Sequence, residues 1–125
     1  MSSEPRRRLS DAGEIGYKEP MQDLVFLSAP YDANDPACME AVSRAVARLL
    51  AGGQYVVTPL LNHYVFPYGD LPRTWEFWGG FARTLLDRCA RLVVLRLPGW
   101  DRAEAVVAEI AHAEAMGIPC DFIDP

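Results

Sequence analysis

Runs of apolar residues mark the candidate strands along the chain. Residues 24–27 and 92–95 are unbroken apolar runs, which are typical of strands covered on both faces. Residues 55–57 form a shorter run closed by a Thr-Pro pair, and residues 119–123 supply a terminal strand. The pattern therefore predicts strands that are short, mostly buried and bounded by turn signals.

Between these runs, apolar residues recur at helical spacing. The first such segment, 36–51, begins with Pro after a possible cap at Asp35 and is followed by two glycines. A second helix is expected over residues 75–89 with Thr74 as its cap, and a third over about 102–116. The part of the chain after the second strand is predicted to be the longest irregular segment inside the domain.

Strands and helices thus alternate in the order βαβαβαβ. This order implies a parallel sheet with right-handed crossovers and helices on both faces. Such sheets bind ligands beyond the carboxyl ends of their strands. We therefore expect a binding site where four residues from different connections and the last helix converge, namely Tyr31, His63, Trp100 and Glu109.

The size of the chain fits a single globular domain. It has 125 residues, of which 50% are apolar, enough for one core but not for a second domain. Residues 1–22 are rich in Ser, Glu, Arg and Gly and lack apolar periodicity. They are predicted to be a flexible leader, followed by one α/β domain at 23–125.

Charge and hydropathy argue against two classes of partner. The formal net charge of −5 argues against a surface for polymeric nucleic acid, although free nucleosides and nucleotides remain possible ligands. The longest apolar runs are far short of a bilayer span, and residues 1–20 lack the hydrophobic region of a secretory signal. We expect a cytoplasmic protein that does not contact a membrane.

Neither a metal site nor a common cofactor motif is indicated. Cys38, Cys89 and Cys120 have no CxxC spacing, and His63 and His112 lie far apart, so no zinc site or disulfide framework is expected. The cysteines are predicted to be reduced and at least partly buried. No glycine-rich phosphate-binding motif follows the first strand, and no serine has the nucleophile-elbow pattern. Of the catalytic chemistries considered, the one that remains is chemistry performed by carboxylate side chains.

Glu109 is the carboxylate that the last helix places nearest to the expected site. It lies about a quarter-turn from the centre of the apolar stripe, at the border of the buried face. From there its carboxylate either reaches the ends of the strands or belongs to an ordinary glutamate at the border of an amphipathic helix. Glu104 and Glu114 are more simply explained as surface charges. The predicted buried stripe of this helix consists of Ala103, Val106, Val107, Ile110 and Ala113.

Several other residues near this edge have two interpretations each. Trp75, Phe77 and Trp78 are first of all core or subunit contacts, and secondarily a wall on which a base can stack. His63 either bonds a backbone carbonyl or contacts a ligand. Both interpretations are open because the side chain of its neighbour Asn62 also ends in a polar group. The residues alone leave these alternatives open.

Four segments, in order along the chain, carry a resemblance to a known family. Residues 26–31 (FLSAPY), 58–63 (TPLLNH), 75–78 (WEFW) and 99–110 resemble an uncharacterised bacterial and phage branch of the nucleoside 2-deoxyribosyltransferase superfamily. The resemblance covers about residues 24–123. It implies a flavodoxin-like (Rossmann-like) three-layer sandwich with strand order 2-1-3-4, and a homodimer or larger homo-oligomer.

The resemblance also implies roles for individual residues. Glu109 matches the helix-borne glutamate that attacks the anomeric carbon of a nucleoside or nucleotide and expels the base, as in retaining glycosidases. Ser28 and Tyr31 would contact the sugar or phosphate, and Trp100 would pack near the base. The full set of expected substrate-binding residues is Ser28, Tyr31, Asn62, His63, Trp100 and Asp101, with no metal and no cofactor.

Two departures from the family pattern weaken the case for activity. Related sequences carry an acidic residue near the position of Ala82, and a Ser-x-Gly or Asp-x-Gly segment where this chain has Ala103-Glu104-Ala105. Asp87, Asp101 and Glu104 could replace the missing carboxylate only if the backbone differs from the family. Two functions therefore stay open: an N-glycosidic hydrolase or deoxyribosyltransferase, or a catalytically impaired nucleotide-binding or assembly module on the same fold.

Overall fold

The computed structural model describes residues 23–125, so the predicted leader at 1–22 lies outside the described residues. Four parallel strands form one sheet in the order β2-β1-β3-β4, which confirms the predicted fold and strand order. The strands are β1 (Leu24–Ser28), β2 (Tyr55–Val57), β3 (Arg91–Leu95) and β4 (Cys120–Ile123). The helices are α1 (Pro36–Ala51), the 3-10 helix η1 (Pro59–Tyr68), α2 (Trp75–Leu86) and α3 (Glu104–Met116).

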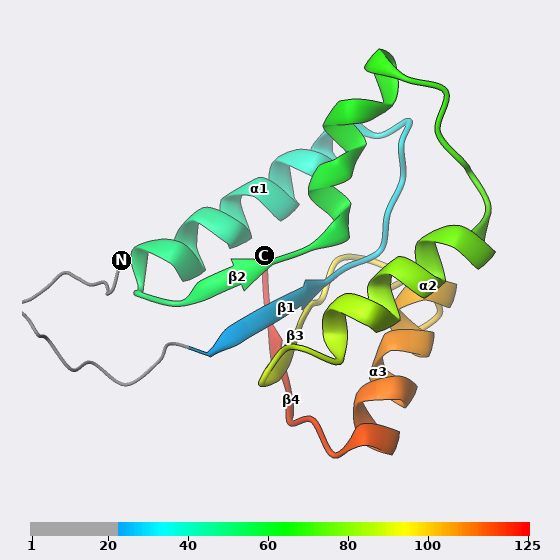
Figure 1. Cartoon of the computed structure of the whole chain (residues 1–125). Helices are drawn as coiled ribbons and strands as arrows, with labels where there is room; N and C mark the ends of the chain where they lie inside the picture. Colours follow the sequence, from blue (N-terminus) through cyan, green and yellow to red (C-terminus); the bar gives the residue numbers. More distant parts are fainter. Residues whose placement is uncertain (1–22) are drawn as a thin grey trace, which may run out of the picture.

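Helices cover both faces of the sheet, with α1 on one side and α2 and α3 on the other (Figure 1). Side chains alternate between the two faces along each strand. In β1, Val25 and Leu27 pack in the cluster with α1, whereas Phe26 packs in the cluster with α2 and α3. Ser28 has the same parity as Phe26, so the strand aims its side chain at the side covered by α2 and α3.

The structure corrects two predictions, namely the irregular segment expected after the second strand and the end of the second helix. The segment after β2 forms η1, because the Thr58 hydroxyl accepts from the backbone N–H of Leu60 and Pro59 starts the first turn. Helix α2 ends at Leu86, three residues before the predicted Cys89. There the backbone N–H of Cys89 bonds the carbonyl of Leu86 in a tighter turn.

The buried face of α3 also differs from the predicted stripe. Val106 and Ala113 are buried as expected, but Val107 is 48% exposed. The third buried residue of the helix is Glu109, which is only 8% exposed. The side chain of Glu109 therefore points into the interior, and it is more buried than a border position implies.

The cysteines are free thiols, with Cys38 and Cys89 buried and Cys120 half-buried, as predicted. Burial raises the pKa of the Cys89 thiol to about 11, which keeps it protonated and unreactive at neutral pH. Within residues 23–125, no helix is both long enough and apolar enough to span a membrane.

Candidate functional site

A pocket of about 330 Å³ lies at the carboxyl ends of β1 and β2, within the size range of small-molecule sites. Its walls come from the connection after β1, from η1, and from helices α2 and α3. The pocket includes four of the predicted site residues, namely Tyr31, Asn62, His63 and Glu109. In a sheet ordered 2-1-3-4, connections to opposite faces leave β1 and β3, and ligands bind at this switch point.

Among the residues that the structure describes, Glu109 carries the only carboxylate in the wall of this pocket. Its oxygen Oε1 accepts a hydrogen bond of 2.6 Å from the Ser28 hydroxyl, which lies 81 positions earlier in the chain. Ser28 itself is only 1% exposed and does not line the pocket, so it contacts Glu109 rather than the space for a ligand. Strand β1 and helix α3 thus fix one rotamer of the carboxylate from behind.

Burial controls the protonation of Glu109. Removal from water disfavours the charged carboxylate and raises its pKa to about 7, and the hydrogen bond from Ser28 opposes part of this rise. Both the acid and the carboxylate are therefore populated near neutral pH. Carboxyl groups with this property act as acids, bases or nucleophiles in enzymes.

Tyr31 and His63 form a polar pair at the mouth of the pocket. The Tyr31 hydroxyl and His63 Nδ1 share a hydrogen bond of 2.7 Å, and the two rings meet edge to face. His63 therefore bonds a side chain and not the backbone carbonyl considered above. Burial is the main cause that raises the pKa of Tyr31, so the phenol stays protonated at neutral pH.

The opposite wall is aromatic and comes largely from α2. Trp75 and Trp78 line the pocket, as the wall for stacking a base would require, whereas Phe77 points outward and is 46% exposed. The indole Nε1 of Trp78 donates to the Pro72 carbonyl at 2.7 Å, and its ring contacts Phe66. This wall is held by both a hydrogen bond and ring packing.

Trp100 and Asp101 do not join the pocket, contrary to the expected convergence. The chain turns sharply after β3 at Gly99, whose φ of +82° suits glycine, and this turn carries the Trp100 ring onto Phe122 of edge strand β4. Asp101 is exposed and lies 3.5 Å from Arg102. Because β4 borders β3 on the side away from β1, the contact with Phe122 places Trp100 toward that edge of the sheet.

Two of the alanines that depart from the family pattern do line the pocket. Ala82 of α2 and Ala105 of α3 form part of its wall, so a carboxylate in place of Ala82 would project toward the same space as Glu109. Ala103 is the N-cap of α3 and provides no side-chain hydrogen bond to the first turn. The helix that carries Glu109 therefore begins without a capping hydrogen bond from a side chain.

Replacing this N-cap is expected to stabilise the protein. Ala103→Ser supplies a hydroxyl to the free N–H groups of the first turn of α3, for a gain of about 1 kcal/mol in the free energy of unfolding. Urea unfolding measures the gain. The matched control, Ala111→Ser on an exposed position inside the same helix, should lose a few tenths of a kcal/mol (about 0.5 at most). Equal effects of the two changes would contradict the capping argument.

Arg73 is a pocket residue that sequence reasoning missed. It directly precedes Thr74, whose hydroxyl caps α2 by accepting from the N–H of Phe77. The predicted cap at Thr74 puts Arg73 directly before the helix of the aromatic wall, but the sequence does not show that this position borders the pocket. Its guanidinium lies over the Phe66 ring, 4.7 Å from the ring centroid.

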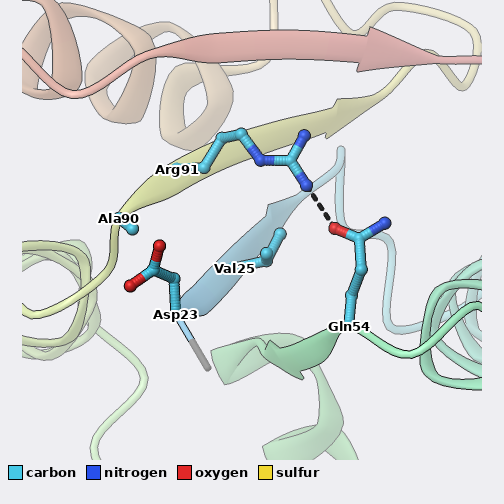
Figure 2. A pocket seen from close by; sticks show the side chains of 5 residues that line it. All are labelled: Asp23, Val25, Gln54, Ala90 and Arg91. Atoms are coloured by element: carbon cyan, nitrogen blue, oxygen red, sulfur yellow. Dashed lines mark hydrogen bonds between the residues drawn. The ribbon is translucent and has the colours of Figure 1, made fainter. Parts of the chain in front are cut away.

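A second, smaller hollow of about 240 Å³ lies at the amino ends of the strands, at the other end of the sheet (Figure 2). Arg91 lines this hollow, but its guanidinium donates a hydrogen bond to Gln54 and forms an ion pair of 2.6 Å with Asp121. These contacts tie β2 and β4 to β3. We therefore interpret this hollow as structural and the Glu109 pocket as the functional site.

Across residues 23–125, no group of three His, Cys, Asp or Glu side chains is arranged to hold a metal ion. The polar side chains that line the pocket include a carboxyl, a phenol, an imidazole, a guanidinium, an amide and a hydroxyl group.

Comparisons with known proteins agree with this fold. A family model described as Domain of unknown function (DUF1937) matches residues 23–123. Among solved structures, a 2-deoxyribosyltransferase from the psychrotolerant bacterium Bacillus psychrosaccharolyticus aligns with a TM-score of 0.60 and 16% sequence identity, over 82% of this chain and 72% of that chain. No curated protein matches the sequence. The chain thus has a nucleoside 2-deoxyribosyltransferase-like fold.

Proposed function

This chain belongs to the family Domain of unknown function (DUF1937), and from its fold and pocket we propose that it cleaves the N-glycosidic bond of a nucleoside or nucleotide, with Glu109 as nucleophile. One observation carries the proposal. A buried carboxyl, held at 2.6 Å by the Ser28 hydroxyl, faces a pocket whose other walls are aromatic and polar. A nucleoside has matching parts, because its base can stack and its sugar can hydrogen-bond.

The reaction follows the two-step course of a retaining glycosidase. In the first step, a Glu109 oxygen bonds the anomeric carbon while the carbon–nitrogen bond breaks, and its electron pair leaves with the base, which takes a proton from solvent. In the second step, water attacks the anomeric carbon, the ester bond to Glu109 breaks, and the carboxylate is restored with release of a proton. Another base in place of water gives transfer instead of hydrolysis.

Ser28 acts in this scheme as a positioning residue. Only the ionised carboxylate is a nucleophile, so with a pKa of about 7 the rate of the first step rises as the pH increases through 7 and levels above it. The hydroxyl of Ser28 favours the ionised form because it donates a hydrogen bond to the charged oxygen. It also keeps the carboxylate in one orientation.

Ser28→Ala is expected to move this pH profile toward higher pH. Loss of the hydrogen bond that lowers the pKa of Glu109 leaves desolvation unopposed, so the rate should fall most below pH 7 and least at pH 9. Single-turnover base release between pH 5 and pH 9 measures the shift. Ser43→Ala on α1 is the matched control and should leave the profile in place. An unchanged or lowered apparent pKa in Ser28→Ala would count against the positioning role.

Base release by the purified protein tests the proposed function. A panel of deoxyribonucleosides, ribonucleosides and their 5′-monophosphates is incubated with the wild type, with Glu109→Ala and with Glu104→Gln, and free base is quantified by chromatography. We expect release from at least one compound, loss of release in Glu109→Ala, and no change in Glu104→Gln, whose carboxylate is exposed. Binding without turnover in the wild type would defeat the enzyme hypothesis.

The alanines of the pocket wall favour a second candidate. Ala82 and Ala105 supply neither a proton nor a hydrogen bond to a ligand, and loss of one positioned acid or base commonly costs roughly a hundred- to ten-thousandfold in rate. We propose, as this alternative, a nucleotide-binding or assembly module that keeps the pocket but not rapid catalysis. The panel together with a binding measurement on the same compounds separates the two candidates, because the alternative predicts binding alone.

We propose further that the protein works as a homodimer or larger homo-oligomer. The side chains of Phe77 and Phe81 on the outer face of α2 are 46% and 41% exposed, next to the helix face that forms the pocket wall. Exposed aromatic side chains that cluster in this way are typical of interfaces. The ligand itself is proposed to be a small molecule, and the protein to act in the cytoplasm.

A further inference from the structure

Among the described residues that line the pocket, one is a permanent cation, Arg73, whose role the reaction described above does not explain. It lies between η1 and α2 and faces the same space as Tyr31, His63 and Glu109. Arginine keeps its charge at all physiological pH values. Arg73 is exposed at the edge of the pocket, so its guanidinium is accessible to a charged group of a bound ligand.

The protein contacts of Arg73 leave its hydrogen-bond donors available. Within residues 23–125, no carboxylate or carbonyl accepts a hydrogen bond from this side chain, and its one close partner is the face of the Phe66 ring at 4.7 Å. By contrast, Arg44 and Arg96 bond Glu40 and Asp124. Stacking on a ring restrains the guanidinium plane without using its N–H groups.

The other charges of the pocket do not satisfy Arg73 either. Burial raises the pKa of Glu109 to about 7, so at neutral pH this carboxyl is ionised only in part. Arg73 is close enough to Tyr31 to lower the pKa of the phenol, against the larger effect of burial. The pocket therefore combines an aromatic wall with a positively charged rim beside Tyr31, a combination that suits a ligand with a flat ring system and an anionic group.

We propose that Arg73 binds a phosphate monoester of the substrate, so that the pocket takes nucleoside monophosphates in preference to uncharged nucleosides. The nucleoside part of this ligand rests on the proposed function, whereas the anionic part rests on the position of Arg73. Guanidinium groups bind phosphate through paired, charge-assisted hydrogen bonds, which fix the orientation of the ligand as well as its affinity.

Calorimetric titration tests the proposal directly. Each 2′-deoxynucleoside and ribonucleoside is compared with its own 5′-monophosphate, and inorganic phosphate is titrated alone. For at least one base, we expect the monophosphate to bind about 10- to 100-fold more tightly than its nucleoside. Arg73→Gln should reduce this ratio to roughly threefold or less, and Arg73→Lys should keep part of it, because Lys keeps the charge but loses the paired geometry.

The matched control is Arg44→Gln, which removes the same charge from an exposed position on α1 and should leave the ratio unchanged. Equal binding of nucleoside and monophosphate to the wild type would overturn the proposal. So would an equal loss of both ligands in Arg73→Gln, the absence of binding by every compound, or binding of inorganic phosphate as tight as that of the best monophosphate. Thermal unfolding of Arg73→Gln verifies that the variant is folded.

Base release by Glu109→Gln, combined with the same titrations, separates this inference from the proposed function. If base release does not depend on Glu109 but the preference for monophosphates depends on Arg73, the nucleophile is wrong and the role of Arg73 stands. If base release depends on Glu109 but nucleosides and monophosphates bind equally, the proposed function stands and the role of Arg73 falls.

Discussion

Glu109→Gln is expected to abolish base release and, at pH 8, to make the folded protein more stable than the wild type. Glutamine fills nearly the same volume as glutamate, but its amide oxygen cannot form the ester to the anomeric carbon. Removal of an essential nucleophile typically costs roughly a thousandfold or more in rate. Single-turnover base release from the best compound of the panel measures this loss.

The gain in stability follows from the cost of burying a charge. The pKa of Glu109 is about 7 in the folded protein, against 4.5 for an unperturbed glutamate, so between these values the folded state binds more protons than the unfolded state. The contribution of this group to stability therefore falls as the pH rises from 4.5 to 7, and above pH 7 the full cost is about 3 kcal/mol. Glutamine has no charge to bury and avoids this cost.

Urea unfolding at several pH values measures the difference between the two proteins. It should be close to zero below about pH 3.5, where Glu109 is protonated in both states, and should approach about 3 kcal/mol at pH 8. Glu104→Gln, in the first turn of the same helix, is the matched control because it replaces an exposed carboxylate instead of a buried one. A Glu109→Gln protein that is no more stable than the wild type at pH 8 would contradict the buried, desolvated state of this carboxyl.

Gly79→Ala is expected to destabilise the protein and to disturb the aromatic wall of the pocket. A Cβ atom at Gly79 would lie 2.8 Å from Cε2 and 3.0 Å from Cζ2 of Trp75, so the indole must move. Crowding of this kind costs about 1–3 kcal/mol, more than the gain of up to ~1 kcal/mol from the better helix propensity of alanine. We also expect weaker ligand binding, by about tenfold, because Trp75 forms part of the wall.

The neighbouring glycine provides a matched control. A Cβ atom at Gly80 would meet only the tip of the Arg83 side chain, at 3.9 Å. Gly80→Ala should therefore be about 0.5–1 kcal/mol more stable than the wild type. Urea unfolding of both variants, followed by tryptophan fluorescence, measures the contrast. Equal stabilisation by the two changes would show that Trp75 is free to move and does not form a fixed wall.

Much of the fold could be predicted from local patterns. The apolar runs and helix caps place every strand and all three α-helices within a few residues of their observed bounds, since signals such as Asp35 before Pro36 act over one or two turns. The strand order came from the resemblance to a family and is confirmed. The strand order, in turn, explains why Tyr31, His63 and Glu109 meet in one pocket.

The parts that could not be predicted depend on contacts between distant residues. Helix α3 carries apolar residues on most of its surface, so its sequence does not reveal which face is buried, and the inward side is settled by packing and by the Ser28–Glu109 bond. Trp100 lies outside the predicted site because its ring packs against Phe122 on the edge strand β4. Arg73 was missed because its place in the pocket depends on how η1 leads into α2.

The most direct test of the role of Glu109 is mass spectrometry of a trapped glycosyl-enzyme. The protein is incubated with a 2-fluoro analogue of its best substrate, which slows the hydrolysis of the ester, and is digested with trypsin. We expect one added sugar on the tryptic peptide that begins at Ala103, localised by fragmentation to Glu109 and absent in Glu109→Gln. Release of base from this analogue without a sugar on Glu109 would contradict it.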